Sequence, residues 1–184
     1  MLTDAGVPHE AMASGVDEDA LKRTLVAESL PPRDFADALA EMKALRVSGR
    51  TPGALVLGGD SIAALEDGTY LDKPVDRDAA RRHLQMLSGR SHKLISAAVI
   101  AEDRRPVWRH VATAQMHVRT LSDAFIERYL DAEWPAISGC VGCYRLEAMG
   151  VQLFSRIQGD YFTILGMPLL PILDYLRTRG VLTS

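Results

Sequence analysis

Asp60 follows a short apolar run, "LVLGG" at residues 55–59, which is typical of a buried β-strand. In an open α/β sheet, ligands gather beyond the carboxyl ends of strands, where side chains emerge into a crevice. A carboxylate at this point could ligate a metal ion or act as a general base. Because a carboxylate repels phosphate, a phosphate site here would also need cations, and Lys73 and Lys43 are the candidates.

The same residues also have simpler explanations. Strand-end aspartates such as Asp60 often cap turns, and Lys43 and Lys73 could be a solvated helix lysine and a turn residue. Gly58 and Gly59 allow close approach of the backbone, but no glycine-rich loop followed by Lys-Ser or Lys-Thr is present, which argues against a P-loop. Composition and spacing alone therefore indicate an α/β domain and leave its activity open.

The elements that would position these residues alternate between helices and strands. The apolar face of a helix at residues 34–47 would carry Phe35, Leu39 and Met42, and Asp76 is the expected N-cap of another helix. The predicted helices are 17–30, 34–47, 76–89, 122–132 and 168–179. The predicted strands are 54–58, 93–101, 110–118 and 161–166, with a hairpin at 61–71 that turns at Asp67 and Gly68. This order predicts an α/β fold with a mixed, twisted sheet and flanking helices.

Length and composition limit the classes of protein to which this chain can belong. The 184 residues, 47% of them hydrophobic, can bury a core and predict a single domain over 1–184. A formal net charge of −3 gives no basic field for nonspecific nucleic-acid binding, and no apolar stretch is long enough to span a membrane. Two cysteines are too few for a disulfide framework, and no leader segment is visible, so the expected compartment is the cytoplasm.

Six separated stretches carry a resemblance to a known family, because they occur in its order and spacing. They are "GVDE" (15–18), "ALAEMKA" (38–44), "LGGDS" (57–61), "DKPVD" (72–76), "LSGRSH" (87–92) and "GDYFTILGMPL" (159–169). Together they span nearly the whole chain and resemble the Maf family of nucleoside triphosphate pyrophosphatases. The resemblance implies an elongated two-lobed α/β fold with a central cleft, similar to that of the inosine triphosphate pyrophosphatases.

The resemblance also implies an activity. Family members hydrolyse nucleoside triphosphates, including modified ones such as 7-methyl-GTP, to the monophosphate and pyrophosphate, using Mg²⁺ or Mn²⁺. Asp60 matches the proton acceptor that activates water, and Glu18 would help to hold the metal or orient the water. Lys43 and Lys73 match the two lysines that neutralise charge on the phosphates. A homodimer is the expected assembly.

Two further positions are implicated in substrate choice by the resemblance. Ser61 stands where many members carry threonine and keeps a hydroxyl. Glu147 stands where one branch of the family carries glutamine. Because an ionised carboxylate accepts but does not donate hydrogen bonds, Glu147 would favour a base edge rich in N–H donors, such as guanine or 7-methylguanine.

One departure from the family concerns phosphate binding. Members usually carry a first strand and a Ser-Pro-Arg-Arg loop before the segment that here reads "LTDAGVPHE", at residues 2–10. The printed sequence starts at Met1 within that segment, so either residues precede it or this copy lacks the loop. The second case supports an alternative function, a catalytically impaired nucleotide-binding regulator linked to cell division.

Cys140 and Cys143 form a Cys-x-x-Cys pair and suggest a third hypothesis, a small metal or redox module. No second ligand pair with suitable spacing accompanies them, and the favoured interpretation is that both are small apolar fillers near the base pocket. His92 is interpreted as a structural hydrogen-bonding group, because a metal-assisted base does not need an imidazole.

Overall fold

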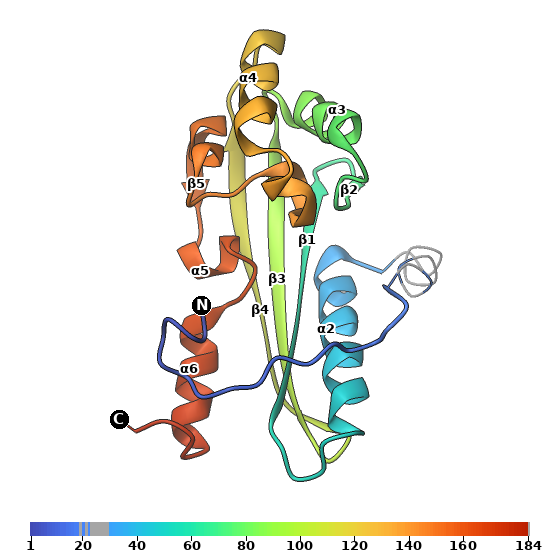
Figure 1. Ribbon diagram of the computed structural model, residues 1–184, viewed down its shortest axis with the longest axis vertical. Helices are drawn as coiled ribbons and strands as arrows, with labels where there is room; N and C mark the ends of the chain where they lie inside the picture. The colour runs from blue at the N-terminus through green and yellow to red at the C-terminus, as the bar shows by residue number, and fades with distance from the viewer. Residues whose placement is uncertain (19, 21, 23–29, 184) are drawn as a thin grey trace. The chain divides into compact units, whose positions relative to one another are not determined.

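The computed structural model describes residues 1–18, 20, 22 and 30–183 (Figure 1). The helix predicted at 17–30 therefore lies mostly outside the described residues. The α-helices are α2 (Pro32–Ser48), α3 (Arg77–Leu87), α4 (Asp123–Glu133), α5 (Tyr161–Ile164) and α6 (Leu169–Thr178), and three 3₁₀ helices are η1 (Ala136–Gly139), η2 (Val141–Cys143) and η3 (Met149–Leu153). The strands are β1 (Val56–Leu65), β2 (Tyr70–Leu71), β3 (Ser91–Glu102), β4 (Arg105–Val118) and β5 (Phe154–Gln158). No helix of the described residues is both long enough and apolar enough to cross a bilayer.

The five strands form one sheet in the order β2-β1-β3-β4-β5, with helices beside it, which confirms the α/β prediction. The sheet is antiparallel, whereas the alternation of helices and strands predicted mixed strand directions. Asp103 and Arg104, both with positive φ (48° and 63°), form a two-residue turn that reverses the chain between β3 and β4. β1 and β2 pair antiparallel, with Ala63 opposite Leu71, as the predicted hairpin requires.

The predicted strand at 161–166 is wrong, because residues Tyr161–Ile164 form the short helix α5. The Asp160 side chain accepts hydrogen bonds from the backbone N–H of Thr163 (2.8 Å) and from its hydroxyl (3.1 Å). This N-cap stabilises a helical turn in a segment whose β-branched and aromatic residues favour a strand. The strand of this region lies upstream, at β5, where it pairs with β4.

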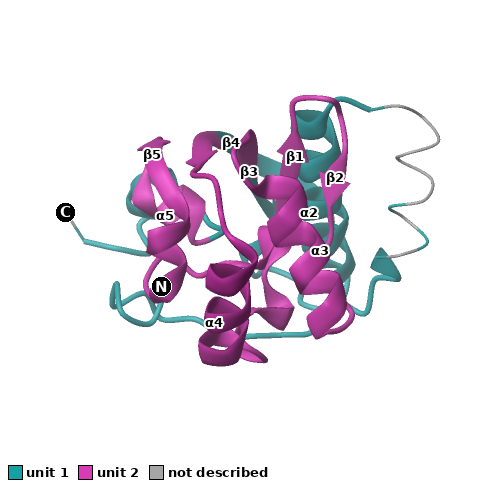
Figure 2. Cartoon of the chain, turned by 90° about the horizontal axis from the view of Figure 1, so that it is seen from above, with its two compact units in different colours: residues 1–60, 96–112, 166–184 teal, residues 61–95, 113–165 magenta. Residues whose placement is uncertain are grey.

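The chain divides into two compact units, each with its own apolar core (Figure 2). Unit 1 comprises residues 1–60, 96–112 and 166–184, and unit 2 comprises residues 61–95 and 113–165. The core of unit 1 includes Val7, Ala98, Ile172 and Leu176. The core of unit 2 is built from α3, α4 and the strand halves of that unit. Asp60 is the last residue of the first segment of unit 1, so the unit 1 elements decide its surroundings.

Helix α2 packs closely on β1 through small residues. Ala40 and Ala44 are fully buried, whereas Met42, which was predicted to face the core, is 42% exposed. A Cβ added at Gly58 of β1 would lie 2.3 Å from the Ala40 carbonyl oxygen and 2.6 Å from the Ala44 nitrogen. The absence of a side chain at Gly58 therefore brings α2, which carries Lys43, directly against β1 two residues before Asp60. Asp60 lies in the middle of β1, which continues to Leu65, so its predicted place at a strand end is wrong.

Gly58→Ala is expected to lower the free energy of unfolding by about 2–3 kcal/mol, because the new methyl group collides with helix backbone that cannot give way. Gly59→Ala is the matched control, since a Cβ at Gly59 would meet only the Ala97 carbonyl oxygen at an ordinary 3.5 Å. Urea unfolding of both variants measures the difference. Equal losses in the two variants would show that α2 does not pack on β1 in this way.

Candidate active site

Three of the predicted site residues meet in unit 1. The Lys43 ammonium, carried by α2, donates to Asp60 Oδ1 at 2.6 Å and lies 2.9 Å from Glu18 Oε1. The Asp60 side chain is only 10% exposed, and that of Glu18 is 34% exposed. The structure thus places one cation between two carboxylates that come from separate segments of the chain.

The surroundings of this cluster shift the proton affinities of both buried partners. Burial, the largest cause, raises the pKa of Asp60, and the charge of Glu18 raises it further. The hydrogen bond and charge of Lys43 lower this pKa, but the net shift is upward. For Lys43, burial lowers the pKa, but the hydrogen bonds and charges of Asp60 and Glu18 outweigh burial and raise it. Lys43 therefore remains an ammonium at neutral pH, and Asp60 is a stronger base than a fully solvated aspartate.

The other predicted residues lie in unit 2. Ser61 follows Asp60 along β1 and is partly exposed. Lys73 is exposed just after β2, and Glu147 is exposed between η2 and η3. Lys73 and Glu147 both affect the pKa of the Cys140 thiol. Burial raises this pKa and the charge of Glu147 raises it further, whereas the charges of Arg145 and Lys73 lower it. Within unit 2, the structure therefore brings Lys73 and Glu147 into the neighbourhood of Cys140.

The Cys-x-x-Cys pair behaves as packing within unit 2. Both thiols are free, and burial raises the pKa of Cys143 to about 12, so it stays protonated. Its sulfur lies 3.3 Å from His83 Nδ1, and its carbonyl oxygen accepts a hydrogen bond from the Tyr129 hydroxyl at 3.0 Å. Across the described residues, no three His, Cys, Asp or Glu side chains gather closely enough to hold a metal ion. The burial of Cys143 agrees with a packing role for this thiol, and the interpretation of the pair as apolar fillers stays a prediction.

His92 is fully buried in unit 2, and its Nε2 lies 2.8 Å from the Tyr144 hydroxyl. Burial and, to a smaller extent, the charge of His117 lower the pKa of His92 to about 4. The imidazole is therefore neutral at physiological pH and serves the structural hydrogen bond that the sequence predicted.

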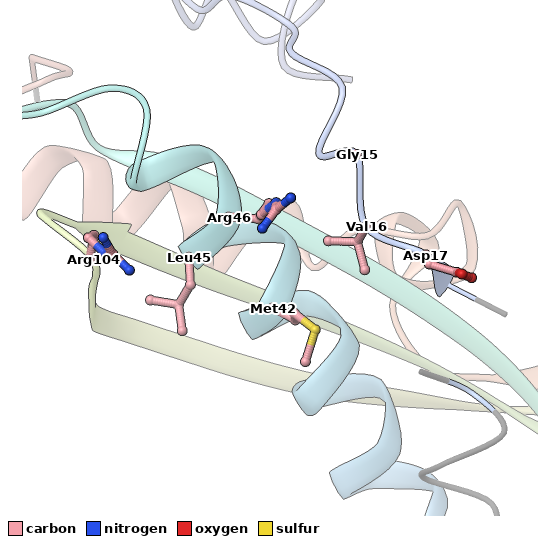
Figure 3. A pocket seen from close by; sticks show the side chains of 7 residues that line it. All are labelled: Gly15, Val16, Asp17, Met42, Leu45, Arg46 and Arg104. Carbon is pink, nitrogen blue, oxygen red and sulfur yellow. The ribbon is translucent and has the colours of Figure 1, made fainter. Parts of the chain in front are cut away.

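A cavity of about 600 Å³ opens on unit 1 beside α2 (Figure 3). Its lining combines apolar side chains with two guanidinium groups and consists of Gly15, Val16, Asp17, Met42, Leu45, Arg46 and Arg104. Asp17 and Met42 are the sequence neighbours of Glu18 and Lys43, but neither of those two residues lines it. The predicted site residues therefore do not belong to this cavity.

Two residues with a place in the site region were missed by the sequence reasoning. Arg145 lies two positions before Glu147 and acts on the pKa of Cys140, and buried Glu133 bonds to Arg145. The sequence shows Glu133 only as one of several charged residues at the end of the predicted helix, and spacing alone assigned it no partner.

Comparison with known proteins agrees with the resemblance. The sequence matches the family described as "Maf-like protein" over residues 1–179. A nucleoside triphosphate pyrophosphatase of Caulobacter vibrioides is 53% identical over 183 residues, which cover 100% of this chain and 91% of the relative. "Nucleoside triphosphate pyrophosphatase 1" of Jannaschia sp. is 51% identical over 181 residues, 98% of this chain and 91% of the relative. With its whole length matched in this way, the chain belongs to the Maf family.

Proposed function

We propose that this protein is a nucleoside triphosphate pyrophosphatase, which hydrolyses its substrate to a nucleoside monophosphate and pyrophosphate. The names of its relatives support the reaction. The observation that carries the assignment of residues is the Lys43 ammonium held between the carboxylates of Asp60 and Glu18. Because both cysteines are free thiols, we place the activity in the cytoplasm.

Asp60 is the proposed general base. Its carboxylate takes a proton from a water molecule while the water oxygen forms a bond to phosphorus. The bond between the monophosphate and the pyrophosphate breaks, and pyrophosphate leaves with the electron pair. The raised pKa of Asp60, caused first by its burial, suits this role because a more basic carboxylate accepts the proton more readily.

The two lysines supply positive charge for the phosphates. Lys43 stays protonated in its buried position, because Asp60 and Glu18 raise its pKa against the effect of burial. Lys73 is exposed to solvent, so its ammonium is accessible to the phosphate oxygens of a substrate. Both ammonium groups would stabilise the negative charge that develops on the phosphate oxygens as the bond to pyrophosphate breaks.

The residues fit a divalent metal of the Mg²⁺ or Mn²⁺ type. Mg²⁺ is commonly held by one or two carboxylates together with substrate phosphates, and the carboxylates of Asp60 and Glu18 lie close enough to share one cation, since both contact Lys43 Nζ. No third His, Cys, Asp or Glu of the described residues joins them, so the substrate would complete the donor set. When bound, the metal would polarise the phosphoryl oxygens. Asp60 and Glu18 would hold it.

Turnover of a nucleotide panel tests the proposal. Each triphosphate consumed, with Mg²⁺ or Mn²⁺ present, is expected to yield one monophosphate and one pyrophosphate, measured together by chromatography. UTP, TTP, CTP, GTP and 7-methyl-GTP form the panel. Calorimetric binding of a nonhydrolysable triphosphate without any product from the panel would instead favour the nucleotide-binding regulator.

Base selection is the proposed role of Glu147 together with Ser61. Glu147→Gln is expected to lower the preference for guanine bases by about tenfold, because the amide replaces an acceptor-only group with one that also donates. The measurement is the ratio of kcat/KM for 7-methyl-GTP or GTP to that for UTP. An unchanged ranking of the bases would contradict the role of Glu147.

A further inference from the structure

The segment that carries Glu147 has little regular structure of its own. Between the end of α4 and the start of β5, the chain forms only the short 3₁₀ helices η1, η2 and η3 (Figure 1). Glu147 is exposed in this segment. An exposed side chain on an irregular segment can select a base only when its backbone is held from outside.

Glu133, the last residue of α4, holds the segment on both sides of Glu147. Its Oε2 accepts from Arg145 Nε (3.1 Å) and Nη2 (2.9 Å), and its Oε1 accepts from the backbone N–H of Met149 (3.1 Å). Glu133 is only 5% exposed. One buried carboxylate therefore fixes the residues two positions before and two positions after Glu147.

The turn between these anchors is closed tightly. The N–H of Ala148 donates to the Arg145 carbonyl oxygen at 3.3 Å. A Cβ added at Gly150 would lie only 2.4 Å from that same oxygen. The geometry leaves residues 145–150 as a compact turn with Glu147 on it, attached to α4 through Glu133.

The same contacts decide which carboxylate Arg145 neutralises. The hydrogen bonds to Glu133 are the largest cause that raises the pKa of Arg145, and the charge of nearby Glu147 also raises it. Glu147 is thus the second carboxylate whose charge acts on the guanidinium. If Glu133 lost its charge, Arg145 would turn toward Glu147, and an ion pair would occupy the oxygens that a base edge needs.

We propose that Glu133 is a positioning residue for base selection: it fixes the 145–150 turn and keeps Arg145 away from Glu147, so that the Glu147 carboxylate is free to meet the base. This inference rests on the proposed function, in which Glu147 reads the base.

Glu133→Gln tests the inference, and Glu127→Gln is its matched control. Glu127 lies on the same helix and also accepts from arginines, Arg77 (3.0 Å) and Arg81 (2.9 Å), but it holds α3 and not the turn. Glu133→Gln is expected to lower the GTP-to-UTP ratio of kcat/KM by at least about fivefold, toward that of Glu147→Gln. Glu127→Gln should leave the ratio within about twofold, and thermal unfolding should show a small loss of stability.

Two further experiments distinguish a positioning role of Glu133 from a general loss of structure. Replacing both charges, Glu133→Gln with Arg145→Met, should restore part of the ratio, because no guanidinium is left to cover Glu147. Hydrogen–deuterium exchange of the Met149 backbone N–H should be faster in Glu133→Gln than in Glu127→Gln, since Glu133 Oε1 accepts from that N–H. The exchange readout needs no turnover.

The outcomes decide the inference in each case. A normal GTP-to-UTP ratio of kcat/KM in Glu133→Gln would overturn the inference, with or without faster exchange of the Met149 N–H, and would leave Glu133 a purely structural residue. If Glu147→Gln also kept the normal ratio, base selection by Glu147 would fall and the inference with it. If the wild-type protein released no pyrophosphate, an unchanged exchange rate of the Met149 N–H in Glu133→Gln would overturn the hold on the turn, independently of the proposed activity.

Discussion

Asp60→Asn is expected to lower the rate of pyrophosphate release by about 10²–10⁴-fold, because the amide cannot take a proton from the attacking water. The variant keeps the size of the side chain and its place after Gly59 in β1. The measurement is the initial rate of pyrophosphate release at saturating substrate. Binding of a nonhydrolysable triphosphate should persist, since the phosphate-binding cations remain.

The loss should not arise from unfolding. The net shift raises the pKa of Asp60 in the folded protein, chiefly because of burial, so the native state binds its proton more tightly than the unfolded chain does. Ionisation of Asp60 therefore costs stability at neutral pH, and a neutral amide removes that cost. The free energy of unfolding of Asp60→Asn at pH 7 is expected to equal or exceed that of the wild type, as urea unfolding would show.

Asp37→Asn is the matched control. Asp37 is also a partly buried aspartate of unit 1, and its carboxylate pairs with Arg109 at 2.5 Å, whereas Asp60 pairs with Lys43. Its turnover should stay within about twofold of the wild type, because an exposed-arginine pair contributes little. An Asp60→Asn enzyme that kept more than about a tenth of its turnover would mean that another group is the base.

The helices and strands around this site could be predicted where a single sequence pattern, such as an apolar run or a helix followed by glycine, was strong. The apolar run before Asp60 and the capped helix before Gly49 are both present, the latter as α2, Pro32–Ser48. The buried face of α2 was misread at Met42, because hydrophobic periodicity gives most weight to large side chains. The face that packs on Gly58 is built from alanines instead, since only small residues allow so close an approach.

The contacts that create chemistry could not be predicted from spacing. Lys43 and Asp60 are 17 positions apart, and they meet only because α2 lies against Gly58. Glu133 and Arg145 are separated by 12 positions, and their pairing depends on the irregular turn that follows η2. Such contacts are set by tertiary packing, which no local period records. The prediction of a single domain over 1–184 stays a prediction.

Lys43→Met is expected to lower turnover at neutral pH by at least about tenfold and to move the acid limb of the pH–rate profile to higher pH. Lys43 lowers the pKa of Asp60 through its hydrogen bond and charge, against burial and the charge of Glu18, which raise it. Without the ammonium, only the two raising influences and the weak opposing charge of Lys22 remain. Asp60 would then need a higher pH to lose its proton and serve as the base.

Lys22→Met is the matched control, because it makes the same substitution at another lysine whose charge acts on Asp60. The charge of Lys22 also lowers the pKa of Asp60, but it is the smallest of the causes, so its removal should shift the acid limb less than the loss of Lys43. Stability gives a second readout. Lys43→Met leaves Asp60 and Glu18 without the cation between them, and the resulting loss of unfolding free energy should shrink as the pH falls and Asp60 becomes protonated. A pH profile that keeps its acid limb while turnover falls would show that Lys43 acts on the phosphates alone; a shifted limb would show that it also tunes the base.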